Sequence, residues 1–356
     1  MQRRASRPVQ VGSVVIGGGA PVSIQSMTTT ATADVSATLG QVRALASAGC
    51  DIVRVAVPTR ADTAALREIV AGSPVPIVAD VHFHFRRALE AVEAGVAKIR
   101  LNPGTLADRG QVREVIAACR AAGVPIRVGV NEGSVHRSEA GRRRDGGPAA
   151  GIMAEALEAY LEPFHEEGFE DLVLSAKSRD AVTCVAVNRI LAGRFDYPLH
   201  LGLTHSGTAR TGLVRSMVAV GALLAEGIGD TVRISLAGDP MAEVTAAKEL
   251  LWSLRLRQRE GVEVIACPTC GRTRADVNAL AEAVGAELAD VREHLTVAVM
   301  GCVVNGPGEA EGVDAAACCG KSRATIYRRG RRVRTVPLAQ IVPALVEEAR
   351  RLLAEG

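Results

Sequence analysis

Eight short runs of apolar, mostly β-branched residues recur along the chain, and each is followed by a polar break and a longer segment. The runs lie at residues 22–26, 52–57, 76–81, 97–101, 126–130, 172–176, 199–203 and 232–236. The segments between them are rich in Ala and Leu and place apolar residues three and four positions apart, as at 35–48 and 213–226. The runs are typical of buried strands and the segments of amphipathic helices. The pattern therefore predicts eight strand–helix units in succession.

Strands that alternate with helices form parallel βαβ units, and eight such units close into a (β/α)8 TIM-type barrel. A doubly wound open sheet is the alternative. Its dinucleotide-binding form carries a GxGxxG fingerprint directly after the first strand. Here Gly17, Gly18 and Gly19 precede the first run instead. The sequence therefore predicts an α/β protein whose larger part is a TIM-type barrel.

The pattern changes after residues 240–257, which we expect to form the last barrel helix. The charged run 255–261 ends in Gly261, and we place a domain boundary between residues 258 and 259. Residues 1–258 are then the barrel, and residues 259–356 form a smaller α/β domain. For this domain we expect strands near Val262 and Val297, a helix at 276–289, a hairpin at 324–336 and a closing helix at 338–353.

The ends of the predicted barrel strands are unusually polar. In a (β/α)8 barrel these ends meet at one face, where the active site lies. The residues that we expect to bind a ligand there are Arg54, Asp80, His82, Arg100, Asn102, Arg127, Asn131, Lys177, His200, Arg233 and Ser235. Buried cations are costly unless they are paired, and Arg binds phosphate through two parallel hydrogen bonds. The set indicates a phosphate or diphosphate pocket, with ion pairing to acids such as Asp80 as the alternative.

A polar insert at residues 132–151 follows the fifth of these runs and is too long for a plain turn between a strand and a helix. A solvated loop and a mobile lid over the strand ends are both consistent with it.

Two loops near the end of the chain carry closely spaced thiols. Cys267 and Cys270 lie in the segment ACPTCGRT, and Cys302 lies in GCVVNGPGEA. Each loop follows an apolar run predicted as a strand, so the two loops can converge in space. Three converging thiolates suit a zinc or iron–sulfur site, and Glu309 in the second loop can add an oxygen ligand. A structural zinc site and buried core cysteines are the alternatives.

These two segments, and much of the chain from about Val11 to its end, resemble bacterial 4-hydroxy-3-methylbut-2-enyl diphosphate synthases of the methylerythritol phosphate pathway. The resemblance implies that Cys267, Cys270, Cys302 and Glu309 hold a [4Fe-4S] cluster. It also implies that the barrel binds 2-C-methyl-D-erythritol 2,4-cyclodiphosphate, and that the enzyme opens its ring and removes water reductively. Flavodoxin or ferredoxin is then the electron donor, and the implied assembly is a homodimer in which the cluster domain of one subunit caps the barrel of the other.

Two segments depart from the family pattern. The family usually has Thr-Glu-Ala-Gly after the seventh strand, with the Glu as acid or base, whereas this chain has Thr-His-Ser-Gly at 204–207. Imidazole titrates near neutral pH, so we predict that His205 is a catalytic residue. The resemblance implies that Glu309 is the second. The Gly-rich segment that follows the second loop in the family is here rich in Ala and contains Cys318 and Cys319.

These departures keep two alternatives open. One is a diverged paralogue that performs [4Fe-4S]-dependent reductive chemistry on another phosphorylated polyol. The other is a metal-binding scaffold without catalysis.

Composition excludes other classes of function. The 356 residues include 3% aromatic residues and carry a formal net charge of +3, which is not typical of a nucleic-acid-binding or membrane-binding protein. We see no signal peptide in the polar N-terminal segment and expect a cytoplasmic protein. Eight cysteines in a reducing compartment are thiols or metal ligands rather than disulfides. We expect Cys50, Cys119 and Cys184 to be small core residues.

Overall fold

The computed structural model describes residues 2–82, 84–102, 108–133, 135 and 149–355. Most of the polar insert predicted at 132–151 lies outside the described residues. The contacts divide the chain into two compact units, residues 1–257 and residues 258–356. Among the described residues, no helix combines the length and the apolar character that a membrane crossing requires.

The first unit is built around eight parallel strands in the order β8-β7-β6-β5-β4-β3-β10-β9. Their bounds are β3 (Ser23–Met27), β4 (Ile52–Ala56), β5 (Ile77–Val81), β6 (Lys98–Leu101), β7 (Ile126–Asn131), β8 (Leu172–Lys177), β9 (His200–Leu201) and β10 (Thr231–Val232). A bridge between Leu174 and Leu199 joins β8 to β9. There the N–H of Leu174 donates to the carbonyl of Pro198 at 2.9 Å. The predicted (β/α)8 barrel is confirmed.

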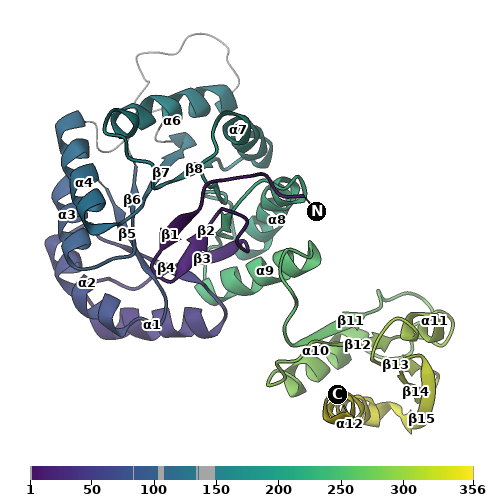
Figure 1. The fold of residues 1–356 in the computed structure, drawn as a ribbon. Coiled ribbons are helices and arrows are strands. Elements are labelled where there is room, and N and C mark those ends of the chain that lie inside the picture. The colour runs from purple at the N-terminus through teal and green to yellow at the C-terminus, as the bar shows by residue number, and fades with distance from the viewer. Residues whose placement is uncertain (1, 83, 103–107, 134, 136–148, 356) are drawn as a thin grey trace. The chain divides into compact units, whose positions relative to one another are not determined.

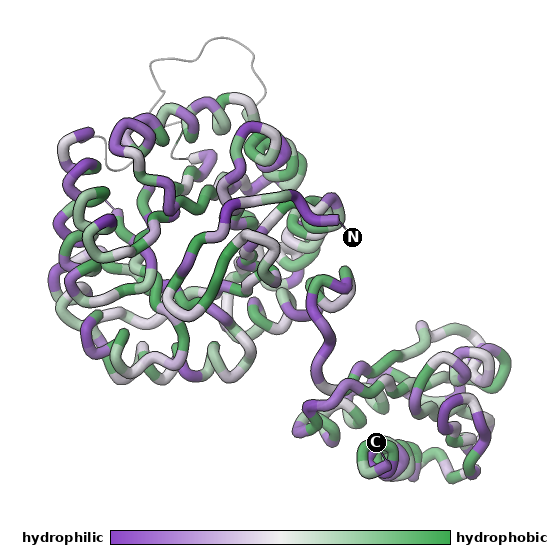
Figure 2. The backbone as a smooth tube through the Cα atoms, in the orientation of Figure 1, coloured by the Kyte–Doolittle hydropathy of each residue, from purple (hydrophilic) through white to green (hydrophobic). Residues whose placement is uncertain are grey.

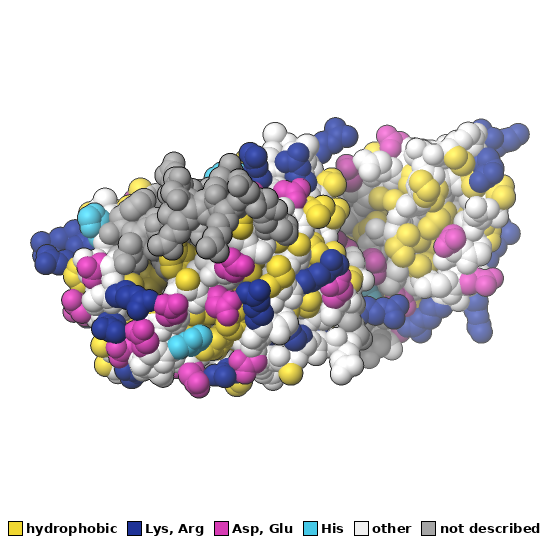
Figure 3. All heavy atoms as spheres, turned by 90° about the horizontal axis from the view of Figure 1, so that it is seen from above, with side chains coloured by type: hydrophobic (Ala, Val, Ile, Leu, Met, Phe, Trp, Pro, Cys, Tyr) yellow, Lys and Arg dark blue, Asp and Glu magenta, His cyan; other side chains and the backbone are white. Residues whose placement is uncertain are grey.

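Helices surround this barrel (Figure 1). They are α1 (Val35–Ser47), α2 (Arg60–Gly72), α3 (Phe85–Glu93), α4 (Arg109–Ala122), α6 (Ala149–Glu166), α7 (Ala181–Arg194), α8 (Ala209–Ala225) and α9 (Pro240–Ser253). Along these helices the backbone tube alternates between hydrophilic and hydrophobic residues (Figure 2), as expected for helices that cover a core on one side. On the face of the barrel shown in Figure 3, basic and acidic side chains are interspersed.

Two helix ends differ from the prediction for local reasons. Helix α8 begins four residues before the predicted 213 because the Thr208 side chain caps it by accepting from the N–H of Thr211. Helix α9 ends at Ser253 rather than 257, because Arg255 adopts a φ of 54° that a right-handed helix does not allow.

A short hairpin that the sequence analysis did not predict covers the barrel at the start of its strands. Strand β1 (Val9–Val11) pairs with β2 (Val14–Ile16) around Gly12, whose φ of 56° favours glycine. The hairpin packs in a small core with Ile52, Val78 and Val173, which lie at the beginnings of β4, β5 and β8. The hairpin therefore closes the face opposite the polar strand ends.

The second unit contains a five-stranded sheet in the order β11-β12-β13-β14-β15. Its strands are β11 (Val262–Ala266), β12 (Leu295–Met300), β13 (Ala315–Cys319), β14 (Arg323–Arg328) and β15 (Arg331–Pro337). The first three strands are parallel, and the last two form the predicted antiparallel hairpin. The helices are α10 (Val277–Glu287), α11 (Gly306–Ala310) and α12 (Ile341–Glu355), the last preceded by the 3-10 turn η2 (Leu338–Gln340).

Strand β13 explains the Ala-rich segment that departs from the family pattern. All five of its residues are buried, and none has a positive φ. Ala317 and Cys319 face the core formed with α10 and α12, whereas Ala316 and Cys318 face α11. Small side chains suit a central strand covered on both faces, so the added Cβ atoms cause no backbone conflict here.

Candidate active site

A cavity of about 210 Å³ lies at the carboxyl ends of the barrel strands. Nine of the eleven predicted strand-end residues line it, together with the predicted catalytic His205. The lining residues are Arg54, Asp80, His82, Arg100, Arg127, Asn131, Ser175, Lys177, Leu203, Thr204, His205, Arg233 and Ser235. The structure therefore brings together side chains that are up to 181 positions apart in the sequence, from Arg54 to Ser235.

Asp80 is the central carboxylate of this cavity. Its Oδ1 accepts a hydrogen bond from Arg100 at 3.1 Å, and its Oδ2 lies 3.8 Å from Nε of Arg54. His82 Nε2 lies 3.5 Å from Oδ1. Burial alone would raise the pKa of Asp80, but Arg54, Arg100 and His82 hold it well below its usual value. Asp80 therefore stays ionised and partly compensates two guanidinium groups.

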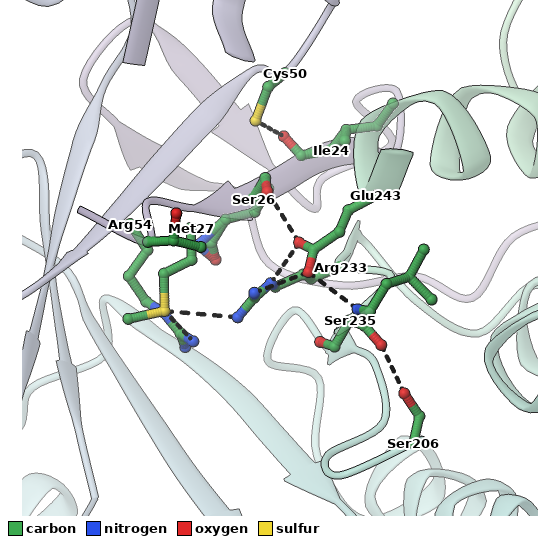
Figure 4. A network of polar contacts seen from close by, with 12 residues as sticks. Ile24, Ser26, Met27, Cys50, Arg54, Ser206, Arg233, Ser235 and Glu243 are labelled. Carbon is green, nitrogen blue, oxygen red and sulfur yellow. Dashed lines mark hydrogen bonds and ion pairs between the residues drawn. The ribbon is translucent and has the colours of Figure 1, made fainter. Parts of the chain in front are cut away.

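Arg54 and Arg233 converge on the sulfur of Met27 (Figure 4). Arg54 donates to Met27 Sδ from Nε at 3.2 Å and from Nη2 at 2.9 Å, and Arg233 Nη1 lies 3.6 Å away. Burial lowers the pKa of Arg54 to about 10, with Asp80 opposing this shift and Arg233 adding to it. Two cations thus lie close together over a weak, uncharged acceptor.

Glu243 on α9 supports this arrangement from outside the cavity (Figure 4). It is buried and accepts two hydrogen bonds from Arg233, at 3.0 and 3.1 Å, and one from the Ser26 hydroxyl at 2.9 Å. The N–H of Leu236 also donates to it. Glu243 was not among the predicted site residues. Its signal in the sequence is a Glu that directly precedes Val244 within the predicted last barrel helix.

Arg127 and Lys177 complete the basic lining. Arg127 is almost fully buried, and its guanidinium donates to the side-chain oxygen of Gln25 at 3.0 Å. Burial, reinforced by the neighbouring guanidinium groups, lowers the pKa of Lys177 well below its usual value. The lining thus contains five basic side chains, Arg54, Arg100, Arg127, Lys177 and Arg233, and one carboxylate, that of Asp80, while Glu243 pairs with Arg233 from outside the lining. The imbalance of charge favours an anionic ligand.

Two predicted residues do not lie on the cavity wall. Asn102 is buried outside the lining, and His200 is fully buried in the barrel, with Nδ1 3.5 Å from the Thr231 hydroxyl. Burial, with the charges of Arg127 and Lys177, lowers the pKa of His200 well below its usual value, so its imidazole is neutral. Lys98, which the sequence analysis did not name, is also fully buried.

His205 follows β9 at the mouth of the cavity and is exposed. Its Nδ1 lies 3.0 Å from the Thr204 hydroxyl, and its φ of 51° is uncommon for a residue with a Cβ. Backbone strain of this kind often marks functional positions.

In the second unit, the two cysteine loops follow the adjacent parallel strands β11 and β12. The N–H of Gly301 donates to Cys267 Sγ at 3.0 Å, and the N–H of Arg274 donates to the Gly301 carbonyl at 3.0 Å. These contacts hold the two loops side by side.

Backbone donors favour thiolates in these loops. The N–H of Arg272 lowers the pKa of Cys270, and the N–H groups of Val304 and Asn305 lower that of Cys302. Glu309 lies exposed on α11. Among the residues that the structure describes, no three His, Cys, Asp or Glu side chains lie close enough to share one metal ion. A [4Fe-4S] cluster has separate iron atoms, so its ligands need not converge on one point.

The remaining cysteines are buried thiols. Cys50, Cys119 and Cys184 lie in the core of the barrel, as predicted. Burial raises the pKa of Cys318 to about 12 and that of Cys319 to about 11, so both stay protonated.

The fold and the site define a class of protein: a TIM barrel with a basic cavity, joined to a small α/β unit with paired cysteine loops. The chain belongs to the GcpE family. It matches the GcpE TIM-barrel domain over residues 6–248 and the GcpE protein C-terminal domain over residues 263–351.

Relatives over nearly the whole chain carry one name, "4-hydroxy-3-methylbut-2-en-1-yl diphosphate synthase (flavodoxin)". The protein of Salinispora tropica is 49% identical over 99% of this chain and 90% of its own length. That of Geobacter sulfurreducens is 46% identical over 98% of both chains, and that of Mycobacterium tuberculosis is 49% identical over 99% of this chain and 91% of its own. These relatives confirm the resemblance drawn from the motifs.

Among solved structures, the dihydropteroate synthase of Yersinia pestis superimposes with a TM-score of 0.52. It covers 70% of this chain and 97% of its own, at 11% identity. This likeness shows the barrel fold alone.

Proposed function

We propose that this protein is a 4-hydroxy-3-methylbut-2-enyl diphosphate synthase acting on 2-C-methyl-D-erythritol 2,4-cyclodiphosphate. The reaction consumes two electrons and two protons, opens the cyclic diphosphate and releases one water. The observation that carries the proposal is the cavity, whose five basic side chains suit a diphosphate. The shared name of the relatives supports the same substrate.

The cavity residues divide into two roles in this proposal. Arg54, Arg100, Arg127, Lys177 and Arg233 bind the phosphate oxygens, because they are the cations that line the cavity. Asp80, His82, Asn131 and Ser235 orient the substrate through their polar atoms. His200 and Asn102 support the wall from within the barrel rather than contacting the substrate.

His205 is the proposed acid or base of the dehydration. It is exposed at the cavity, and its ring is oriented by the Thr204 hydroxyl. Asp80 is unsuited to donating a proton because Arg54 and Arg100 keep its pKa low. Imidazole both accepts and donates protons near neutral pH. His205 would then perform the role of the Glu that the family usually has at this position.

Cys267, Cys270, Cys302 and Glu309 are the residues that would hold a [4Fe-4S] cluster. The lowered pKa values of Cys270 and Cys302 and the donor from Gly301 to Cys267 suit thiolate ligands. Such a cluster supplies one-electron transfer and a Lewis-acidic iron. Glu309 adds an oxygen ligand from α11 and is the second proposed catalytic residue.

The proposed function also implies partners for this protein. Flavodoxin, which the names of the relatives include, or a ferredoxin would supply the electrons. The proposed assembly is a homodimer in the cytoplasm, in which each cluster domain caps the barrel of the other subunit.

The decisive test is an anaerobic assay of the reconstituted protein with the cyclodiphosphate and reduced flavodoxin. We expect turnover in the wild type and loss of at least about a hundredfold in kcat/KM for Arg127→Met, since a buried phosphate contact is removed. Glu158→Ala is the matched control, because Glu158 pairs with Arg194 on the exposed surface.

Iron- and sulfide-loaded wild type that leaves the cyclodiphosphate unchanged would contradict the proposal. Binding of the substrate without turnover would then favour the diverged paralogue that acts on another phosphorylated polyol. Zinc without sulfide in the purified protein would favour the scaffold.

A further inference from the structure

Glu132 is a carboxylate at the barrel rim that the proposed chemistry does not use. It follows Asn131, the last residue of β7, and is half-buried. Its Oε2 accepts a hydrogen bond from the Ser178 hydroxyl at 2.7 Å. Ser178 follows Lys177, the last residue of β8. The contact thus joins the ends of two neighbouring strands that both contribute to the cavity.

The register of the strands determines which way these side chains face. Asn131 pairs with Lys177 in the parallel ladder of β7 and β8, and both residues line the cavity. Glu132 and Ser178 directly follow the ends of these two strands and are absent from the lining. A ligand in the cavity would contact Lys177 and Asn131, whereas Glu132 is not part of the lining.

Ser178 connects three segments with a single buried residue. Its hydroxyl accepts from the N–H of Asp180 at 2.9 Å, so its own proton is directed to Glu132. Its carbonyl accepts from the N–H of Thr204 at 3.2 Å. Thr204 in turn lies 3.0 Å from the imidazole of His205. Ser178 is fully buried, so loss of any of these partners would leave a polar group unsatisfied.

Lys177, the residue before Ser178, packs closely against the β9 segment. A Cβ at Gly202 would lie 3.1 Å from Lys177 Nζ and 2.6 Å from the Arg233 carbonyl, so the β9 segment packs directly against these cavity residues. His205 is held at a positive φ. Ser178 is thus connected to Lys177 through the chain and to Thr204, the residue before His205, through its carbonyl.

We propose that Glu132 is a positioning residue that fixes Lys177 and His205 through the hydroxyl and carbonyl of Ser178. This inference rests on the proposed function for the reaction that it assists. The hydrogen bond, not the negative charge, is the essential feature, because Glu132 does not face the ligand.

Four variants of the full-length, cluster-reconstituted protein test this proposal: Glu132→Ala, Glu132→Gln, Ser178→Ala and the double variant Glu132→Ala/Ser178→Ala. The first readout is the Kd for inorganic diphosphate by calorimetry, which reports on Lys177. The second is kcat and KM with the cyclodiphosphate, which also report on His205. Glu158→Ala on α6 is the matched control, a Glu whose partner Arg194 is exposed.

We expect Glu132→Ala to lower kcat by about tenfold and to weaken diphosphate binding by about threefold, the scale of one lost hydrogen bond. Glu132→Gln should stay within about threefold of the wild type in both, because the amide oxygen accepts from Ser178 equally well. Ser178→Ala should match Glu132→Ala, and the double variant should be no worse than either single variant.

Several results would overturn the proposal. An equal loss in Glu132→Gln and Glu132→Ala would show that the charge itself acts. Additive losses in the double variant would show that the effect does not pass through Ser178, and an unchanged Glu132→Ala would show no role at all. If Glu132→Ala does not fold, Glu132→Gln is compared with Ser178→Ala. A loss in Ser178→Ala alone supports the proposal, and an equal loss in both variants contradicts it.

The two proposals fail separately. If the wild type shows no turnover, the proposed function fails, and the diphosphate affinities of the four variants still decide whether Glu132 positions Lys177.

Discussion

Gly306 and Cys318 show how closely single residues fit beneath the second cysteine loop. Gly306 opens α11, the helix that carries Glu309. A Cβ at Gly306 would lie 2.7 Å from Cys318 Sγ and 3.1 Å from the Cβ of Met300. Both neighbours belong to buried strands, so neither can move away easily.

We predict that Gly306→Ala destabilises the second unit by about 1–3 kcal/mol through overpacking. Hydrogen exchange of the β13 amides in the intact protein measures this loss. Gly308→Ala is the control, because no atom lies within 4 Å of a Cβ at that position of the same helix. It should be neutral or slightly stabilising, since Ala favours a helix over Gly. Equal protection in wild type and Gly306→Ala would contradict the prediction.

Lys177 should gain a proton when an anion enters the cavity. Burial, followed by the charges of Arg127, Arg54, Arg233 and Arg100, lowers its pKa in the free protein. A bound dianion opposes the repulsion from these cations, so binding raises the pKa and takes up protons. Affinity for the anion should accordingly fall as the pH rises.

Sulfate is a suitable probe because it does not titrate near neutral pH. We expect calorimetry in two buffers of different ionisation enthalpy to show proton uptake on sulfate binding. The uptake should be smaller in Lys177→Met. Equal uptake in both proteins would assign the proton to another group.

At the scale of elements, helix α9 is tied to the cavity by one buried side chain. Glu243 accepts from Arg233, from Ser26 of β3 and from the N–H of Leu236. The helix thereby links the first strand of the barrel to the segment after its last strand, where Arg233 and Ser235 lie (Figure 4).

We predict that Glu243→Ala lowers the free energy of unfolding of the barrel by about 3–5 kcal/mol, because Arg233, whose side chain is only 15% exposed, would be left without its carboxylate. Urea unfolding followed by Trp252 fluorescence measures the change. Glu158→Ala removes a Glu from an exposed ion pair on α6 and should cause no comparable loss. If both variants lose a similar free energy of unfolding, the burial of the Arg233–Glu243 pair does not determine its contribution.

For the whole molecule, the buried basic groups of the barrel determine how stability depends on pH. His200 is neutral in the folded protein because burial lowers its pKa. Below its ordinary pKa of about 6.5, the unfolded chain binds a proton that the folded chain does not. Stability therefore falls as the pH decreases through that range. Asp80 adds to this trend at lower pH, because its depressed pKa favours folding only while it is ionised.

We predict that the free energy of unfolding falls between pH 6.5 and pH 5, with His200 contributing up to about 1.4 kcal/mol per pH unit. His200→Gln should reduce this slope, because Gln does not titrate. Urea titrations at four pH values measure it. If the free energy of unfolding of His200→Gln depends on pH as steeply as that of the wild type, other groups cause the loss of stability.

Much of the fold could be predicted from the sequence, because the spacing of apolar residues in the strands differs clearly from their spacing in the helices. Runs of β-branched residues alternate with helical segments, and the polar residues at the ends of these runs indicated the face of the site. The three cysteines and Glu309 were also identifiable, since their spacing lies within two short segments. The hairpin β1–β2 was missed because strands of three residues give little signal.

The sequence by itself determined the order of the strands and helices of the barrel, the polar strand ends and the two cysteine loops, because each depends on residues close together in the chain. Only the tertiary structure decided which strand-end side chains reach the cavity, leaving His200 and Asn102 outside its lining. Only the structure paired Glu243 with Arg233 and Glu132 with Ser178. These outcomes depend on strand register and closure of the barrel, and both are set by packing between segments that are distant in sequence.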